Sequence, residues 1–272
     1  MKYNSLFDKS RTLRLGYKYR KNPSDPSISP FAYNGTLEEV IADLMNLTNI
    51  PRNEEETIKL AIHPQRIIKA CIDYKITHSE NIFADELVLE AINFSLTTYS
   101  LGCCSKTKLK YLTNKMEKIG NSEIFTAPLI QPDDHITWSS SAGHKSRELA
   151  ERLTKEVEKK DLLFIALGHG GIASGMDVFL RYKDYVQIND GFFYAIRYSQ
   201  DKKGDPHPQM SEKETTILQN ESRKRDVFVF DEDMGKYETM LKACSFFLYN
   251  TLQDKTKING IINLYTRFYL NL

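Results

Sequence analysis

One short apolar run that ends in acidic residues constrains the fold more than any other feature of the chain. Residues 227–230 read Val-Phe-Val-Phe and are followed directly by Asp231, Glu232 and Asp233, then by a short loop and a second apolar run at 240–247. Such a run predicts a buried strand, and the run behind the loop predicts a helix. Ligands of open α/β sheets bind at the carboxyl ends of strands, and helix N-termini attract phosphate. The pattern therefore predicts a sugar-phosphate site where this strand ends.

Helices and short β-rich runs alternate from residue 135 to the end of the chain. Such alternation is typical of crossover units and predicts an α/β fold with a mostly parallel sheet flanked by helices. The run Ile258–Leu272 is expected to complete this sheet or to cover its edge. The predicted helices are 143–159 and 173–183, and the predicted strands are 162–167, 192–198, 215–219 and 227–230.

The upstream part of the chain has helical spacing instead. Thr36-Leu37-Glu38-Glu39 has the order of a capping box, and helices are expected at 55–62, 64–76, 84–99 and 106–119, with breaks at prolines that include Pro64. The first 35 residues are polar, basic and interrupted by prolines, so helix is not expected there. The predicted domains are a basic arm at 1–35, a helical domain at 36–130 and the α/β domain at 135–272.

Composition narrows the class of protein. The 37 basic and 36 acidic residues leave a formal charge of +1, which gives no overall argument for binding nucleic acid or an acidic membrane surface. Four cysteines show no C-x-x-C spacing, which favours reduced thiols and a cytoplasmic protein. The N-terminus has no apolar signal-peptide core, and no stretch of about 18 apolar residues occurs, as a spanning helix would need. We therefore expect a soluble protein that is neither secreted nor in a membrane.

A glycine-rich stretch at 168–175 follows the predicted strand 162–167 and admits several interpretations. Its spacing resembles a P-loop, but Met176 and Asp177 stand where lysine and a hydroxyl residue are needed, which excludes that motif. It also fits a dinucleotide fingerprint, although the next strand ends at Arg197 without the acidic residue that would hold a ribose. A third interpretation is a loop whose small residues let a diphosphate approach the backbone. A tight turn that needs glycine for conformational reasons alone also stays open.

Taken together, the two loops resemble the type I phosphoribosyltransferase family, over roughly residues 143–272. In that family four apolar strand residues, an acidic pair and a loop ending in threonine cradle the 5-phosphate of phosphoribosyl diphosphate. The segment from Val227 to Thr239 matches this in length and in the placement of its acidic pair. Gly168–Gly171 corresponds to the family's upstream diphosphate loop, and the polar stretch 200–214 to a loop that closes over the substrate.

The resemblance implies a role for each matching residue, with Mg²⁺ as cofactor. An enzyme that displaces diphosphate from an anomeric carbon needs a binding site for the 5-phosphate, a metal ion on the diphosphate and exclusion of water. Asp231 and Glu232 would be catalytic and would hold the ribose hydroxyls, either directly or through Mg²⁺. The phosphate would be lined by Gly235, Lys236 and Thr239. The diphosphate would be faced by His169, Gly170 and Gly171.

Gly235, Lys236 and Tyr237 replace the hydroxyl-rich centre of the family's phosphate loop, so the chain resembles a degenerate member. Degenerate domains of this kind, fused to helical segments, resemble effectors of bacterial defence systems, including some associated with retrons. That resemblance implies a partner protein or nucleic acid held by the helical half and the basic arm. Two functions stay open: an enzyme that transfers or cleaves a ribosyl group, and a catalytically inactive nucleotide sensor or interaction scaffold. A Rossmann-type nucleotide protein is a third option.

Overall fold

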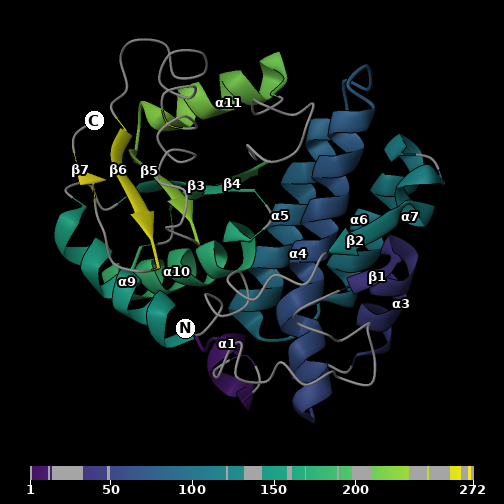
Figure 1. Ribbon diagram of the computed structural model, residues 1–272, viewed down its shortest axis with the longest axis horizontal. Helices are drawn as coiled ribbons and strands as arrows, with labels where there is room; N and C mark the ends of the chain where they lie inside the picture. Colours follow the sequence, from purple (N-terminus) through teal and green to yellow (C-terminus); the bar gives the residue numbers. More distant parts are fainter. Residues whose placement is uncertain are drawn as a thin grey trace. The chain divides into compact units, whose positions relative to one another are not determined.

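The chain divides into two compact units, Met1–His144 and Lys145–Leu272, which are treated in turn below. Figure 1 shows the elements of both units in a computed structural model of the chain. The structure describes residues 2–11, 13, 33–47, 50–120, 122–131, 143–157, 161–168, 170–188, 190–197, 210–232, 244, 258–264 and 269–270.

Unit 1 is built mainly from helices (Figure 1). Helix α4 packs against α3 on one side and α5 on the other, and α6 packs against α5. The side chains that these helices bury are largely aliphatic, as the spacing of apolar residues requires. The helices are α1 (Leu6–Lys9), α3 (Leu37–Asn46), α4 (Glu54–Thr77), α5 (Ala84–Leu101), α6 (Lys106–Gly120) and α7 (Glu123–Thr126).

The start of α3 confirms the capping box predicted at Thr36. The Thr36 side chain accepts a hydrogen bond from the backbone N–H of Glu39 at 3.3 Å, and the Glu39 carboxylate accepts one from the backbone N–H of Thr36 at 2.9 Å. These two bonds satisfy donors that a helix N-terminus would otherwise leave without a partner. Helices α5 and α6 likewise cover the ranges predicted for them.

The predicted break at Pro64 is wrong, because α4 runs through it as one helix of 24 residues. A proline inside a helix removes one backbone hydrogen bond and crowds the preceding turn. Here α5 supplies hydroxyl groups to that stretch: the Tyr99 hydroxyl donates to the carbonyl of Ala61 at 2.5 Å, and the Ser95 hydroxyl donates to the carbonyl of Pro64 at 3.1 Å. Contacts with a neighbouring helix thus stabilise α4 across its proline.

The expectation that the first 35 residues contain no helix is also wrong in part. Leu6–Lys9 form the short helix α1, whose Leu6 and Phe7 are fully buried. Strand β1 (Tyr33–Thr36) pairs antiparallel with β2 (Pro128–Gln131), with Thr36 opposite Pro128. The arm is therefore tied into unit 1 at both of these points by contacts that are distant in sequence.

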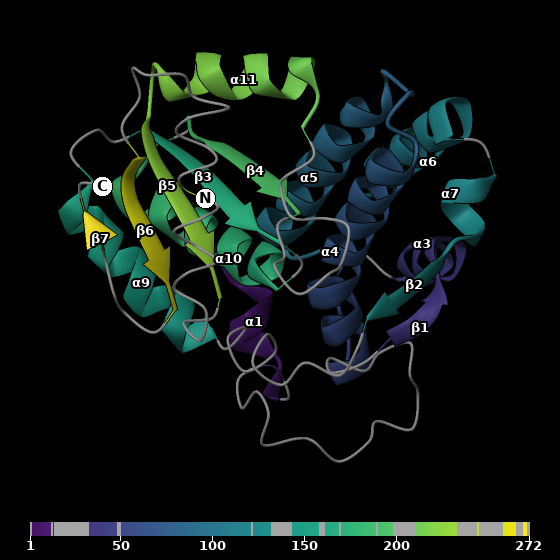
Figure 2. The same cartoon turned by 45° about the horizontal axis from the view of Figure 1, so that its top comes forward.

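The described strands of unit 2 form a mixed, mostly parallel sheet (Figure 2). Its order is β4-β3-β5-β6-β7; β4, β3, β5 and β6 are parallel, and β7 runs antiparallel to β6. This confirms the predicted α/β class with a parallel sheet flanked by helices. The strands are β3 (Leu162–Leu167), β4 (Phe192–Ile196), β5 (Asp226–Asp231), β6 (Ile258–Asn263) and β7 (Tyr269–Leu270).

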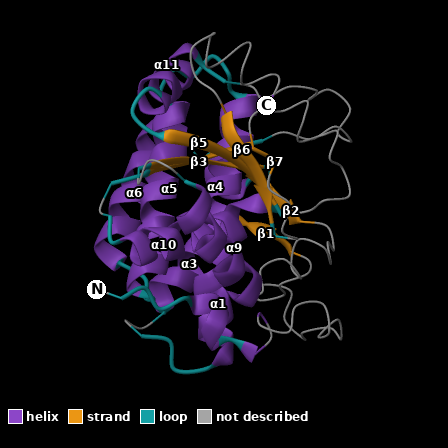
Figure 3. Ribbon diagram, turned by 90° about the vertical axis from the view of Figure 1, so that its left-hand side faces the viewer, coloured by secondary structure: helices purple, strands orange, loops and turns teal. Residues whose placement is uncertain are grey.

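Helices cover both faces of this sheet, as Figures 2 and 3 show. Helices α9 (Gly143–Glu156) and α10 (Gly171–Val186) lie on one face, and α11 (Glu212–Ser222) lies on the other. Right-handed crossovers explain the arrangement: the chain passes from β3 to β4 in one direction and returns past β3 to β5 in the opposite direction. The connecting helices α10 and α11 must then lie on opposite faces.

The strand predicted at 215–219 is wrong, because these residues belong to α11. The consecutive threonines and isoleucine there favour a strand by propensity. A capping box overrides them: the Ser211 side chain accepts from the backbone N–H of Glu214 at 3.1 Å, and the Glu214 side chain accepts from the backbone N–H of Ser211 at 3.0 Å. The polar loop expected at 200–214 therefore ends in a helix, and its part before residue 210 lies outside the described residues.

An aromatic cluster fastens α10 to the sheet. The ring centroid of Phe164 on β3 lies 5.3 Å from that of Phe230 on β5 and 5.7 Å from that of Phe193 on β4. Phe179 of α10 stacks obliquely against Phe193, also at 5.7 Å. Burying each such ring contributes about 1.5–3 kcal/mol. This packing fixes the N-terminus of α10 relative to the carboxyl ends of β3 and β5.

No helix in the described ranges is both long and apolar enough to cross a lipid bilayer.

Candidate functional site

The two predicted loops follow neighbouring parallel strands, and the order in which the chain adds strands to the sheet reverses between these two strands. Strand β3 pairs with β4 on one edge and with β5 on the other, so the order of strands reverses between β3 and β5. In open α/β sheets this reversal opens a crevice at the carboxyl ends, and ligands bind there. The glycine loop at 168–171 follows β3, and Asp231 and Glu232 end β5. Tertiary structure thus brings both predicted loops to the one edge where a ligand is expected.

Gly168 opens the glycine loop in a conformation that favours glycine. Its φ is +38°, in the left-handed region that other residues rarely adopt. Its backbone N–H donates to the carbonyl of Ile196 at 2.7 Å. This bond ties the start of the loop to the end of β4, so the loop turns sharply from the sheet into α10.

Gly170 and Glu232 come into direct contact beyond the carboxyl ends of β3 and β5. A Cβ atom at position 170 would lie only 1.7 Å from Oε1 of Glu232 and 2.2 Å from its Cδ. Position 170 therefore accommodates the carboxylate of Glu232 because it has no side chain. Next to it, a Cβ at Gly171 would lie 3.5 Å from Oε2 of Glu232, an ordinary contact. The Glu232 carboxylate lies against the backbone of both glycines.

The same contact places the carboxyl group of Glu232 at the start of α10. Gly170 is the N-cap of this 16-residue helix and has no side chain with which to cap it. Carboxylates are stabilised near helix N-termini by about 0.3–1 kcal/mol, and by more when partly buried. Glu232 is 8% exposed, so its carboxyl group is largely withdrawn from water. Glu232 therefore differs from the solvated acidic residues expected at a simple strand-to-helix junction.

Asp231 differs from Glu232 in its exposure and its neighbours. It is partly exposed, and its Oδ1 accepts a hydrogen bond from the backbone N–H of Glu232 at 2.8 Å. It lies opposite Asn263 in the pairing of β5 with β6, and Asn263 is 3% exposed. The buried amide at the carboxyl end of β6 was missed by the sequence interpretation. The signal was available, because Asn263 ends an apolar run in the same way that Asp231 ends β5.

Buried charges elsewhere in unit 2 have partners and are structural. Nε of Arg181 lies 3.1 Å from Oδ2 of Asp177, one turn away on α10, and both side chains are nearly inaccessible. The Tyr194 hydroxyl on β4 donates to Oε1 of the fully buried Glu214. The Tyr194–Glu214 bond holds α11 to the sheet, whereas the Arg181–Asp177 pair lies within α10.

Several predicted site residues lie outside the described part of the chain. These are His169 in the glycine loop and Gly235, Lys236 and Thr239 in the loop after β5. Their roles stay predictions. Of the predicted set, Gly170, Gly171, Asp231 and Glu232 are described, and all four are at the carboxyl edge of the sheet.

The sequence predicts Mg²⁺ as a cofactor held by Asp231 and Glu232. Mg²⁺ usually binds through one or two carboxylates, keeps several waters and takes further oxygens from substrate phosphates. Asp231 and Glu232 supply two carboxylates, and the partial exposure of Asp231 leaves room for water. Within the described ranges, no group of three or more His, Cys, Asp or Glu side chains gathers as a closed metal site would need. Asp231 and Glu232 would be the residues to hold a magnesium ion shared with a phosphate ligand.

All four cysteines are free thiols. Burial raises the pKa of the Cys71 thiol far above its ordinary value, and it raises the pKa of Cys104 to about 11 and of Cys244 to about 12. A nucleophilic cysteine needs a lowered pKa. These three thiols are therefore packing groups, and they give no alternative nucleophile for the site.

Comparison of the whole chain with models of known protein families, with characterised proteins and with solved structures finds no match.

Proposed function

We propose that unit 2 binds phosphoribosyl diphosphate or a related nucleotide together with Mg²⁺, as a phosphoribosyltransferase-like protein, and that it transfers or cleaves a ribosyl group. One observation carries the proposal. Glu232 from the end of β5 lies against Gly170 in the loop after β3, at the point where the strand order reverses. An acidic residue and a side-chain-free loop at that edge are what a ribose linked to a diphosphate would require.

Each described residue would have a distinct role. Asp231, being partly exposed, would accept hydrogen bonds from the ribose hydroxyls. The backbone of Gly170 and Gly171, at the N-terminus of α10, would face the diphosphate. Carboxylates close to the anomeric carbon would stabilise the positive charge that develops as the glycosidic bond breaks. A bound Mg²⁺ would neutralise charge on the diphosphate.

The position of Glu232 makes a specific demand on this binding. Its carboxylate already lies against the glycine backbone that the diphosphate would approach. Two anions in so small a space repel each other strongly when they are shielded from water. A cation between them removes the repulsion, so ligand binding should require Mg²⁺ in the native protein. It should require Mg²⁺ much less once Glu232 is neutral.

Calorimetric titration tests the proposal. Phosphoribosyl diphosphate is titrated into the native chain, Asp231→Asn and Glu232→Gln, each with Mg²⁺ and with EDTA. Glu148→Gln, an exposed change on α9, is the matched control. We expect Mg²⁺-dependent binding in the native chain and the control, and loss of binding in Asp231→Asn. Equal binding by all four proteins, or none by any, would remove the proposal.

A catalytically inactive nucleotide sensor or interaction scaffold is the second candidate. It is favoured by the near-complete burial of Glu232, since a carboxylate that packs against backbone is poorly placed to move during a reaction. In this version the chain would serve in a bacterial defence system, with unit 1 and the basic arm holding a partner protein or nucleic acid. Free thiols suit the cytoplasm. Binding without any product, across a screen of nucleobase and nucleic-acid acceptors, would favour the sensor over the enzyme.

A further inference from the structure

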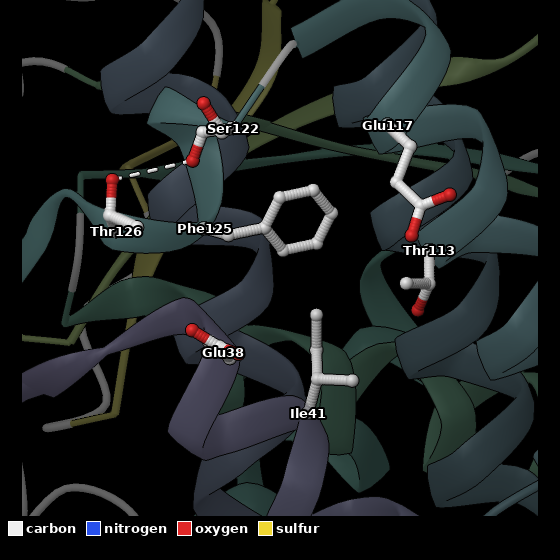
Figure 4. A pocket seen from close by; sticks show the side chains of 7 residues that line it. All are labelled: Glu38, Ile41, Thr113, Glu117, Ser122, Phe125 and Thr126. Carbon is white, nitrogen blue, oxygen red and sulfur yellow. Dashed lines mark hydrogen bonds between the residues drawn. The ribbon is translucent and has the colours of Figure 1, made fainter.

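Unit 1 contains a cavity with an apolar centre and acidic walls. Its volume is about 450 Å³, and it lies among α3, α6 and α7. Figure 4 shows the ring of Phe125 and the side chain of Ile41 pointing toward each other across the middle of this cavity. Glu117 lies on one side, on α6, and Glu38 lies on the other, on α3. A volume of this size accommodates one large apolar side chain or a small ligand.

The two glutamates of this cavity are available to an external partner. Both are exposed, and no described residue forms an ion pair or hydrogen bond with either carboxylate. Within the described residues, no lysine or arginine lines the cavity. Two negative charges therefore flank an apolar centre without compensation from the surrounding helices.

A neighbouring cavity of about 540 Å³ provides an internal comparison. Thr126 of α7 lines both cavities, so the two meet at this short helix. In the second cavity Glu123 already contacts Nε2 of His78 at 2.9 Å, and Asp73 contacts Nζ of Lys69 at 3.1 Å. The carboxylates of the second cavity are thus satisfied by the protein's own side chains, whereas those of the first are not.

We propose that the cavity between Phe125 and Ile41 docks a segment of a partner protein that carries an apolar side chain between two basic residues. The apolar side chain would displace water from Phe125 and Ile41, and the flanking cations would pair with Glu38 and Glu117. Complementary charge selects this occupant. The phosphates of a nucleic acid would meet two carboxylates here and be repelled, so this face is a protein-binding face. The inference does not depend on the ligand site of unit 2.

Fluorescence anisotropy with a defined probe tests the docking site. The probe is a labelled pentapeptide with the sequence glycine, lysine, leucine, lysine, glycine, titrated with the full chain at low salt. Glu38→Gln and Glu117→Gln should each weaken binding about two- to fivefold, as expected for exposed ion pairs. Glu80→Gln, an exposed change in the same unit at a residue that lines neither cavity, should leave it unchanged. Phe125→Ala should weaken binding further, with circular dichroism confirming that the variant is folded.

Two further probes make the outcome decisive. Replacing the peptide's leucine by serine should weaken binding, and replacing both lysines by glutamate should abolish it. The inference is overturned if the peptide fails to bind at millimolar concentration, or if both glutamate variants bind it as the native chain does. It is also overturned if a labelled oligothymidylate binds and Glu38→Gln or Glu117→Gln weakens that binding, because those carboxylates would then be supporting a nucleic acid.

Discussion

Substituting alanine for Gly170 is the most direct test of the contact on which the candidate ligand site rests. The new Cβ would lie 1.7 Å from Oε1 of Glu232 and within 2.7 Å of all three carboxylate atoms, whereas ordinary contact begins near 3.4 Å. These atoms end a flexible side chain, but Glu232 is 8% exposed, so turning its carboxyl group aside displaces packed neighbours. Overpacking of this kind costs about 1–3 kcal/mol. We therefore expect Gly170→Ala to lower the free energy of unfolding of unit 2 by that amount.

A matched control and a double-mutant cycle make the test specific. Gly171→Ala places its Cβ 3.5 Å from the same carboxylate, an ordinary contact, so it should be neutral or stabilising by about 0.4–1 kcal/mol. Adding Glu232→Ala to Gly170→Ala removes the clash, and the two changes should couple by at least about 1 kcal/mol. Hydrogen exchange of the β3 and β5 amides reports the stability of unit 2. Additive effects in the cycle, or equal effects of the two glycine substitutions, would refute the contact.

Three further predictions concern stability. Burial lowers the pKa of His63 from 6.5 to about 4, although its hydrogen bond to Asp43 acts in the opposite direction. Between these two pKa values the unfolded chain binds a proton that the folded chain does not, so the free energy of unfolding should fall by about 3 kcal/mol from pH 7 to pH 4. Urea unfolding should show a shallower fall over this pH range for His63→Gln. Thr36→Ala should cost about 1 kcal/mol, seen as faster hydrogen exchange in α3 alone. Tyr194→Phe leaves buried Glu214 without its hydroxyl donor and should cost about 1–3 kcal/mol in urea unfolding; an unchanged midpoint would contradict the role of that bond.

The parts of the fold that could be predicted are those with strong local patterns. Helices α5 and α6 follow from apolar spacing and their flanking breaks, and β3 and β5 follow from short, fully apolar runs. The capping box at Thr36 positions the start of α3. In each case the residues that decide the structure lie within one or two turns of each other, so local sequence suffices.

The two errors have different causes, one a contact distant in sequence and the other a local capping signal. Pro64 predicts a break, but Ser95 and Tyr99 of α5 supply hydroxyl groups to that part of α4. Residues 215–219 have strand propensity, but the box formed by Ser211 and Glu214 starts a helix that packs over the sheet. That second error was avoidable, because the Ser-x-x-Glu order was present in the sequence.

For the candidate site, the sequence by itself determined the chemistry, namely a glycine loop after one buried strand and an acidic pair after another. It could not determine that these strands are neighbours, because the order of strands in a sheet depends on which surfaces pack together. The tertiary structure decided that β3 and β5 flank the reversal of strand order, that Glu232 fills the space above Gly170, and that Asn263 lies opposite Asp231. Those relations join segments about 30 to 65 residues apart, and only the packing of helices across both faces of the sheet brings them together.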